Sequence, residues 1–109
     1  MAEAASERLI SSDLRFVEVQ RTDPPDLLAT GSQTLTTYRG LELGLWEAGP
    51  GTDTDVEVHE IFLVLEGEGT VEFVDGSAIE LRPGVLVKLF AGDHTRWVVH
   101  QRIRKLYLA

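Results

Sequence analysis

The chain has 109 residues, the length of one small domain, and contains no cysteine. A disulfide framework, a thiolate zinc site and a cysteine nucleophile are therefore excluded, and the composition suits a reducing, cytoplasmic setting. Acidic residues outnumber basic ones by 18 to 10, for a net charge of −8. We therefore expect no nucleic-acid partner, because phosphate backbones require clustered Lys and Arg. We also expect no membrane association, since no apolar run approaches the roughly 20 residues that cross a bilayer.

The first half of the chain predicts strands separated by polar segments. Residues 1–13 are small and polar and predict a tail, or alternatively an arm that lies on a partner subunit. Residues 14–20 alternate between apolar and polar side chains and predict an edge strand. Two further strands are predicted at residues 33–39, which are Thr-rich, and at residues 41–48, which alternate at period 2. Residues 52–57 are predicted to form an acidic loop.

The central stretch, residues 60–74, predicts a β-hairpin. Residues 61–65 are all apolar and have the length of a buried strand. Gly67 and Gly69 supply the backbone freedom that a tight turn needs, and residues 70–74 alternate as a returning strand. Glu60 is therefore predicted at the entrance of a buried strand.

Residues 75–109 also predict short strands separated by turns. Further strands are predicted at residues 85–90, 97–100 and 103–108, and turns at residues 75–76, 83–84 and 91–93. About eight to ten short antiparallel strands with closely spaced turns are typical of an all-β sandwich or a small barrel.

Two segments carry a resemblance to a known family. Glu60, followed after six residues by Gly67, resembles the second half of the first cupin motif, G-x5-H-x-H-x3/4-E-x6-G. Residues 82–95 resemble the second motif, with Gly84 and Gly92 on its two glycines. The resemblance implies that residues 14–109 form a single jelly-roll (cupin) β-barrel.

The resemblance also defines where a metal would lie. Metal-dependent cupins hold iron, manganese, nickel or zinc through two histidines and a glutamate of the first motif and one histidine of the second. Glu60 occupies the glutamate position. The two histidine positions fall on Asp53 and Asp55, or with a shorter spacer on Thr54 and Val56, so neither is a histidine.

In the second motif the histidine position is Thr95, and His94 comes one residue early. Such an offset turns a strand residue to the opposite face, unless a bulge re-aims it. Counting alternate residues from Glu60 and from Thr95 predicts which side chains face the barrel interior. The predicted ligand pocket comprises Phe62, Val64, Thr95 and Trp97.

Three functions remain open on these residues. The first is a cupin that binds a small polar or sugar-like metabolite, with Glu60 and His94 as a metal-independent acid–base pair. The second is a metal-dependent enzyme with ligands drawn from Asp55, Glu60 and His94, or an oxygen-only site that Asp53, Asp55 and Glu57 form with Glu60. The third is a non-catalytic ligand-binding or sensory domain.

Residues 46–51 and 104–107, together with Glu60 and Trp97, resemble one branch of short single-domain cupins. That branch is similar to ureidoglycine aminohydrolase and to the cupin of ethanolamine utilisation. The resemblance implies a homodimer in the cytoplasm, and it implies no particular reaction.

Overall fold

The computed structural model describes residues 4–109 and consists largely of antiparallel β-strands. A short helix, α1 (Ala5–Arg8), and a 3-10 turn (Leu14–Phe16) precede all of these strands. The strands are β1 (Gln20–Arg21), β2 (Gly31–Tyr38), β3 (Leu41–Ala48), β4 (Gly51–Val56), β5 (Glu60–Phe73), β6 (Ala78–Leu81), β7 (Leu86–Leu89) and β8 (His94–Leu108). No helix within residues 4–109 is long and apolar enough to cross a membrane.

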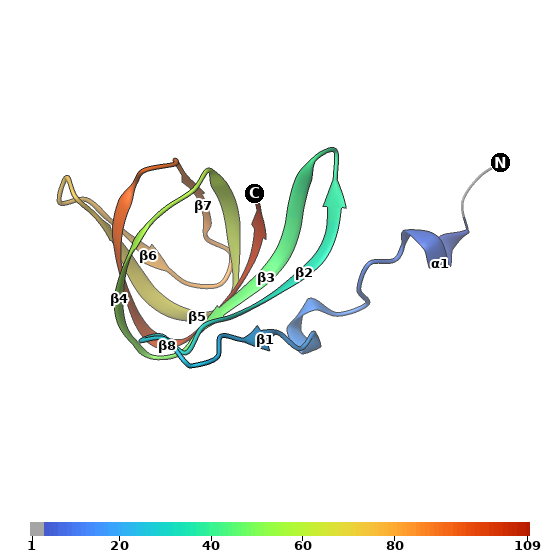
Figure 1. Ribbon diagram of the computed structural model, residues 1–109, viewed down its shortest axis with the longest axis horizontal. Helices are drawn as coiled ribbons and strands as arrows, with labels where there is room; N and C mark the ends of the chain where they lie inside the picture. The colour runs from blue at the N-terminus through green and yellow to red at the C-terminus, as the bar shows by residue number, and fades with distance from the viewer. Residues whose placement is uncertain (1–3) are drawn as a thin grey trace.

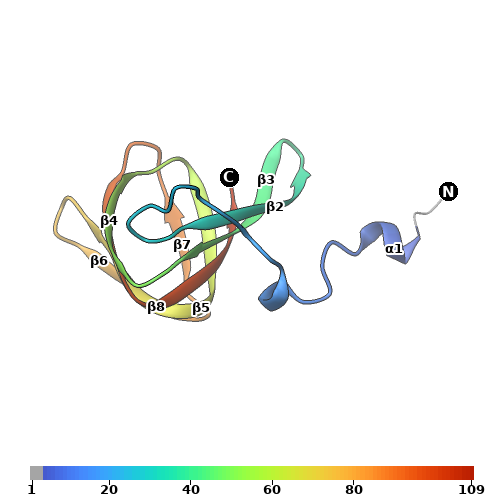
Figure 2. The same ribbon diagram turned by 60° about the horizontal axis from the view of Figure 1, so that its bottom comes forward.

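Strands β5 and β8 pair with each other along nearly their whole lengths and form the centre of the fold. Both bend where the pairing register shifts, around residues 64–69 of β5. On one side of the bend the strand order is β1-β2-β3-β8-β5-β7, and on the other it is β4-β8-β5-β6. The two halves form opposite walls of a small barrel (Figures 1 and 2). The predicted all-β jelly-roll fold is therefore confirmed.

The predicted central hairpin is wrong. Residues 60–73 form one continuous strand, because both of its halves pair with β8 instead of with each other. Gly67 lies in this strand with φ at +95°, a conformation that favours glycine, and it marks a bend in place of a turn. The same reasoning joins residues 97–100 and 103–108, predicted as two strands, into the single β8.

Two further element predictions need correction. Of the strand predicted at residues 14–20, Leu14–Phe16 form a 3-10 turn, which the Asp13 side chain caps by accepting a hydrogen bond from the Arg15 amide, and the strand β1 begins only at Gln20. The predicted acidic loop is instead strand β4 at residues 51–56, paired in regular register with the first half of β8. Pairing with β8 thus imposes a strand on a sequence of low β propensity.

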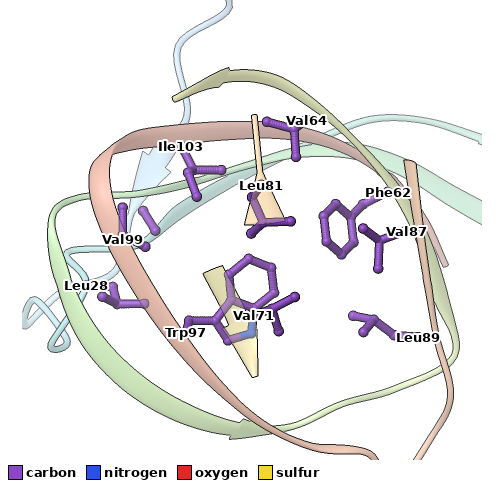
Figure 3. Packing of buried hydrophobic residues seen from close by; sticks show 11 residues of the cluster. Leu28, Phe62, Val64, Val71, Leu81, Val87, Leu89, Trp97, Val99 and Ile103 are labelled. Atoms are coloured by element: carbon purple, nitrogen blue, oxygen red, sulfur yellow. The ribbon is translucent and has the colours of Figure 1, made fainter. Parts of the chain in front are cut away.

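The core fills the space between the two walls (Figure 3). Phe62, Val64, Trp97 and Val99 are all at most 4% exposed, so the alternation counted from the sequence is confirmed for both strands. Figure 3 shows Phe62 and Trp97 directed into the interior; their ring centroids are 5.6 Å apart. This apolar packing fixes the direction of every inward-facing side chain near the site described below.

The N-terminal segment leaves the barrel. Helix α1 has no buried residue and lies away from the strands in both views (Figures 1 and 2). At Leu14 the segment is attached to the barrel, because its carbonyl accepts a hydrogen bond of 2.7 Å from Arg104. Arg104 lies on the outer face of β8 and also binds Glu47 of β3, at 2.9 Å. Residues 1–3, part of the predicted tail or arm, lie outside the described residues.

Candidate functional site

A cavity of about 530 Å³ lies between β3, β4 and the ends of β5 and β8. Its size is within the range of small-molecule sites in proteins. Its lining is made by Asp26, Leu28, Thr30, Ser32, Trp46, residues 53–58, Glu60, Trp97, Lys105 and Tyr107. The cavity therefore combines aromatic walls with several carboxyl groups and a single lysine.

The most unusual feature of this cavity is an ion pair at its base. Lys105, on β8, is 5% exposed, and its Nζ lies 2.6 Å from Oε2 of Glu60, the first residue of β5. Lys is almost never buried to this degree unless it is paired. Lys105 pairs with Val64, and Glu60 lies four residues before Val64 on the same face of β5, so the two long side chains meet along the inner face of the sheet.

Three aromatic rings surround the same ammonium group. The Nζ of Lys105 lies 4.3 Å from the ring centroid of Phe62, 4.6 Å from that of Trp46 and 5.0 Å from that of Trp97. Each distance is within the range of a cation–π interaction, which strengthens when the cation is desolvated. Lys105 is thus held as a fixed cation between a carboxylate and an aromatic cage formed by Trp46, Phe62 and Trp97.

A second carboxyl group is held in the cavity by hydrogen bonds. Oε2 of Glu57 accepts bonds of 3.1 Å from both the Thr95 hydroxyl and the Trp97 indole N–H. Burial raises the pKa of Glu57 above its ordinary value of 4.5, and the nearby charge of Asp55 adds to this effect; the two hydrogen bonds act in the opposite direction. Glu57 can therefore donate a proton at a higher pH than an exposed glutamate.

Tyr107 closes the cavity near β3. Its hydroxyl donates a hydrogen bond of 3.0 Å to Oε2 of Glu42, whose Oε1 accepts one of 2.6 Å from Thr34. Burial, and then this bond to Glu42, raise the pKa of Tyr107. The ring lies over Gly44, where any Cβ would overlap it. A glycine at this position therefore makes room for Tyr107.

The structure distributes the predicted pocket residues among different surroundings. Trp97 lines the cavity, whereas Phe62 and Val64 belong to the packed core, with Phe62 reaching Lys105. Thr95 is buried and binds Glu57, and it also borders a groove on the outside of the barrel.

His94 and Glu60 are not brought together. His94 is exposed and lines the outer groove with Asp55, whereas Glu60 lines the cavity. The register of β4 with β8 is regular from Val56 opposite His94 onward, so no bulge turns His94 inward. His59 is also exposed, and its Nδ1 accepts a hydrogen bond from the Ala91 amide.

The residues present do not fit the metal that the cupin resemblance implies. Within residues 4–109, no three His, Asp or Glu side chains are arranged to hold a metal ion. Glu60, the one residue that matches the family's ligand set, is already bound by an ammonium group. A divalent cation next to it would be repelled by Lys105. Asp55, Glu60 and His94 therefore do not form the predicted ligand set, and the acidic row 53–57 does not form an oxygen site with Glu60.

The sequence analysis gives Lys105 no role in the site, and it names Glu57 only as a ligand of the alternative oxygen site. Two-residue steps continued from Val99 reach Ile103 and Lys105, which are 0% and 5% exposed. The step between them, Gln101, is exposed at the bend, so alternation makes Lys105 a candidate for the interior without showing that it is buried. The hydrogen bonds of Glu57 to Thr95 and Trp97 follow from the pairing of β4 with β8, which the sequence, interpreted as an acidic loop at residues 52–57, does not predict.

Comparisons with known proteins agree with this fold. The sequence profile of the EutQ-like cupin domain matches residues 37–107, well over half of the chain. No curated protein matches the chain. Three solved structures are similar to it at 22–23% identity, a level that supports the fold alone.

The first is ethanolamine utilization protein Q from Salmonella typhimurium LT2, with 23% identity, a TM-score of 0.73 and coverage of 89% of this chain and 81% of that one. The EutQ protein of Clostridium difficile has the same identity and TM-score, with coverage of 90% and 83%. The polyketide cyclase RemF of Streptomyces resistomycificus has 22% identity, a TM-score of 0.69 and coverage of 91% and 77%. On the evidence of the profile match and the barrel itself, this chain belongs to the EutQ-like cupin domain family.

Proposed function

We propose that the protein binds a small polar metabolite in the cavity and acts on it without a tightly held metal. The observation that carries this proposal is the ion pair of 2.6 Å between Lys105 and Glu60 at the base of the cavity. In the metal-dependent cupins the corresponding glutamate serves a metal. In this chain Glu60 binds the ammonium group of Lys105 instead. The positive charge next to Glu60 is therefore supplied by a side chain of the protein and not by a metal ion.

The chemistry of these groups supports acid–base work. An ammonium group has three N–H donors, and Glu60 is the single hydrogen-bond acceptor of Lys105 within residues 4–109. A ligand oxygen that reaches this ammonium group would accept a second of its N–H groups, and negative charge that develops on that oxygen during proton transfer would be stabilised. Glu60 can accept a proton from the ligand, and Glu57 is a second proton donor in the same cavity.

The solved structures do not select one reaction. One of the similar proteins is named for ethanolamine utilization and another is a polyketide cyclase, and these activities are those proteins' own. We therefore rest the proposal on the cavity of this chain. A non-catalytic binding role would use the same cavity and the same lysine, and it differs only in the absence of turnover.

Binding can be tested with the chain's own fluorescence. The protein contains two tryptophans, Trp46 and Trp97, and both line the cavity. In the presence of a chelator, titration with a panel of polyols, hydroxy acids and amino alcohols should give a saturable change with at least one compound. Lys105→Met should weaken that binding by tenfold or more, whereas Glu80→Gln, an exposed carboxylate outside the cavity, should leave it unchanged.

Acid–base chemistry has its own readout. Dihydroxyacetone carries a carbonyl oxygen for Lys105 and C–H groups that a base can deprotonate. If the proposal is correct, the chelated protein exchanges these hydrogens for deuterium in heavy water, as followed by proton NMR, and Glu60→Gln stops the exchange. A saturable fluorescence change without exchange would reduce the function to binding. The absence of any saturable response, or a response that requires added metal, would contradict the proposal.

We also propose that the protein is a cytoplasmic homodimer. The absence of cysteine agrees with a reducing compartment. The apolar residues exposed on the N-terminal segment, among them Leu9 and Ile10, support self-association.

A further inference from the structure

We infer that the ligand of this cavity is a small hydroxyl-bearing organic cation, bound with an oxygen atom at Lys105 and its positive charge at Asp55 and Glu57. This inference rests on the proposed binding function and assigns the ligand class.

The first step concerns the lysine. Lys105 is 95% enclosed, and its ammonium group is directed into a cavity where one carboxylate accepts one of its three N–H groups. A buried donor gains most from an acceptor when water cannot replace it. A hydroxyl or carbonyl oxygen of the ligand is such an acceptor. The charges of Lys105 and Glu60 compensate each other. This end of the cavity therefore favours a neutral polar atom of the ligand over a charged group.

The second step concerns the rest of the lining. Besides Glu60, four carboxyl groups line the cavity, on Asp26, Asp53, Asp55 and Glu57. None of these four forms an ion pair with any residue from 4 to 109, whereas Glu60 is paired. Among the described residues, Lys105 is the only basic side chain that lines the cavity. An anionic ligand would therefore face uncompensated negative charge, and a cationic ligand would supply the missing positive charge.

The third step concerns Glu57. Its raised pKa reflects burial and the proximity of Asp55, which both disfavour the carboxylate. A bound ammonium group would relieve both effects at once, because it supplies a hydrogen-bond donor and a compensating charge.

The test uses compounds that share a frame and differ in charge. One set is aminopropanol, propanediol and hydroxypropionate, and a larger set is glucosamine, glucose and glucuronate. Each is titrated into the full-length protein, with the fluorescence of Trp46 and Trp97 as the readout. We expect the cationic member of at least one set to bind about tenfold more tightly than its neutral counterpart, the gain of one charge-assisted hydrogen bond.

Variants assign that preference to the acidic row. Asp55→Asn combined with Glu57→Gln should remove the preference for the cation while the neutral compound still binds, because the new amide oxygens can accept the same local hydrogen bonds. Glu80→Gln is the matched control and should keep the preference. Higher salt should reduce the preference, since Asp55 is exposed and screened.

The outcomes separate this inference from the proposed function. Tighter binding of the neutral or anionic member in both sets would overturn the cation assignment and leave a ligand-binding cavity in place. A preference for the cation that survives the Asp55 and Glu57 substitutions would also overturn it. Failure of all six compounds to change the fluorescence would count against the inference and the proposed function together.

Discussion

Lys105 and Glu60 form the pair on which the site depends. Each is nearly enclosed, with 7% and 14% of the side chain exposed, so each charge relies on the other for compensation. Removing one partner leaves an uncompensated charge in a poorly hydrated place, and this costs more than the pair contributes. The useful quantity for this pair is therefore the loss in unfolding free energy when one partner is removed, and not the net contribution of the intact pair to stability.

A double-mutant cycle measures that penalty. We expect Glu60→Gln and Lys105→Met each to lower the free energy of unfolding by about 3 kcal/mol, because each leaves one buried charge alone. The double variant should be more stable than either single variant, since no lone charge remains. The measurement is urea denaturation of all four proteins under one condition. Additive losses in the double variant would show that the two side chains act independently.

Glu57 gives a second prediction, which concerns pH. Its pKa is raised in the folded protein, so its contribution to stability is complete below about pH 4.5 and is lost as the pH rises through the raised value. Glu57→Gln cannot lose a proton. We therefore expect the variant to gain stability relative to the wild type as the pH increases from about 4 to 7. A constant difference in unfolding free energy over this range would contradict the raised pKa of Glu57.

For individual residues, the sequence predicted which side chains face the interior better than it predicted what each side chain does there. Alternation placed Phe62, Val64, Thr95 and Trp97 inside because a strand imposes a strict two-residue period. It could not tell that Phe62 and Val64 belong to packed core, since cavity and core share one face of the same strand. The partner of Glu60 is 45 residues away in sequence, and only the register of β5 with β8 brings it close.

At the scale of elements, the fold depends on two long strands that bend. The sequence predicted strands at the positions of β2, β3, β5, β7 and β8, but it divided β5 and β8 into two pieces each and assigned most of β4 to a loop. Glycines such as Gly67 and Gly69 occur both in hairpin turns and at bends of a paired strand, so their presence in the sequence does not distinguish the two structures. What decides is the partner: β8 pairs with residues on both sides of Gly67.

Gly67 provides the test of this interpretation. An added Cβ would collide with the backbone carbonyl of Arg102 on β8, and the φ of +95° is itself unfavourable for alanine. Gly76, in the β5–β6 turn, has a similar φ of +89° but has no atom within 4 Å of an added Cβ. We expect Gly76→Ala to lower the free energy of unfolding by about 1 kcal/mol from backbone strain alone.

Gly67→Ala should cost about 3 kcal/mol or more, because a paired backbone must also move. Thermal and urea unfolding of the two variants give the comparison. Equal losses would mean that the bend at Gly67 is not held tightly against β8.

For the whole molecule, the N-terminal segment is the part that a single barrel leaves unexplained. Leu9 and Ile10 are 64% and 55% exposed on a segment that leads away from the strands (Figure 1). Apolar side chains on a projecting segment gain by burial on a second copy. The sequence predicted either a tail or an arm over residues 1–13, and it could not decide because the decision depends on a surface of another subunit.

The prediction is a dimer that depends on these side chains. Light scattering at tens of micromolar should give a dimer mass for the wild type and a monomer mass for the double variant Leu9→Ser and Ile10→Ser. Val74→Ser, an equally polar change at a residue that is 82% exposed in a turn of the barrel, should remain a dimer. A monomeric wild type would contradict the homodimer, and a dimeric double variant would assign the interface to another surface.

The two walls of the barrel share β5 and β8, and this determines which parts of the molecule can unfold locally. The walls cannot separate or unfold one at a time, because each contains half of the same two strands. Their amide protons should exchange with solvent only when the whole domain unfolds, at one common free energy. Strands β4 and β7 are each paired with a single neighbour, and should open locally at lower cost. Lys105, in the half of β8 that pairs with β5, thus belongs to the part of the cavity that opens last, whereas β4, which carries the acidic row, should open at lower cost.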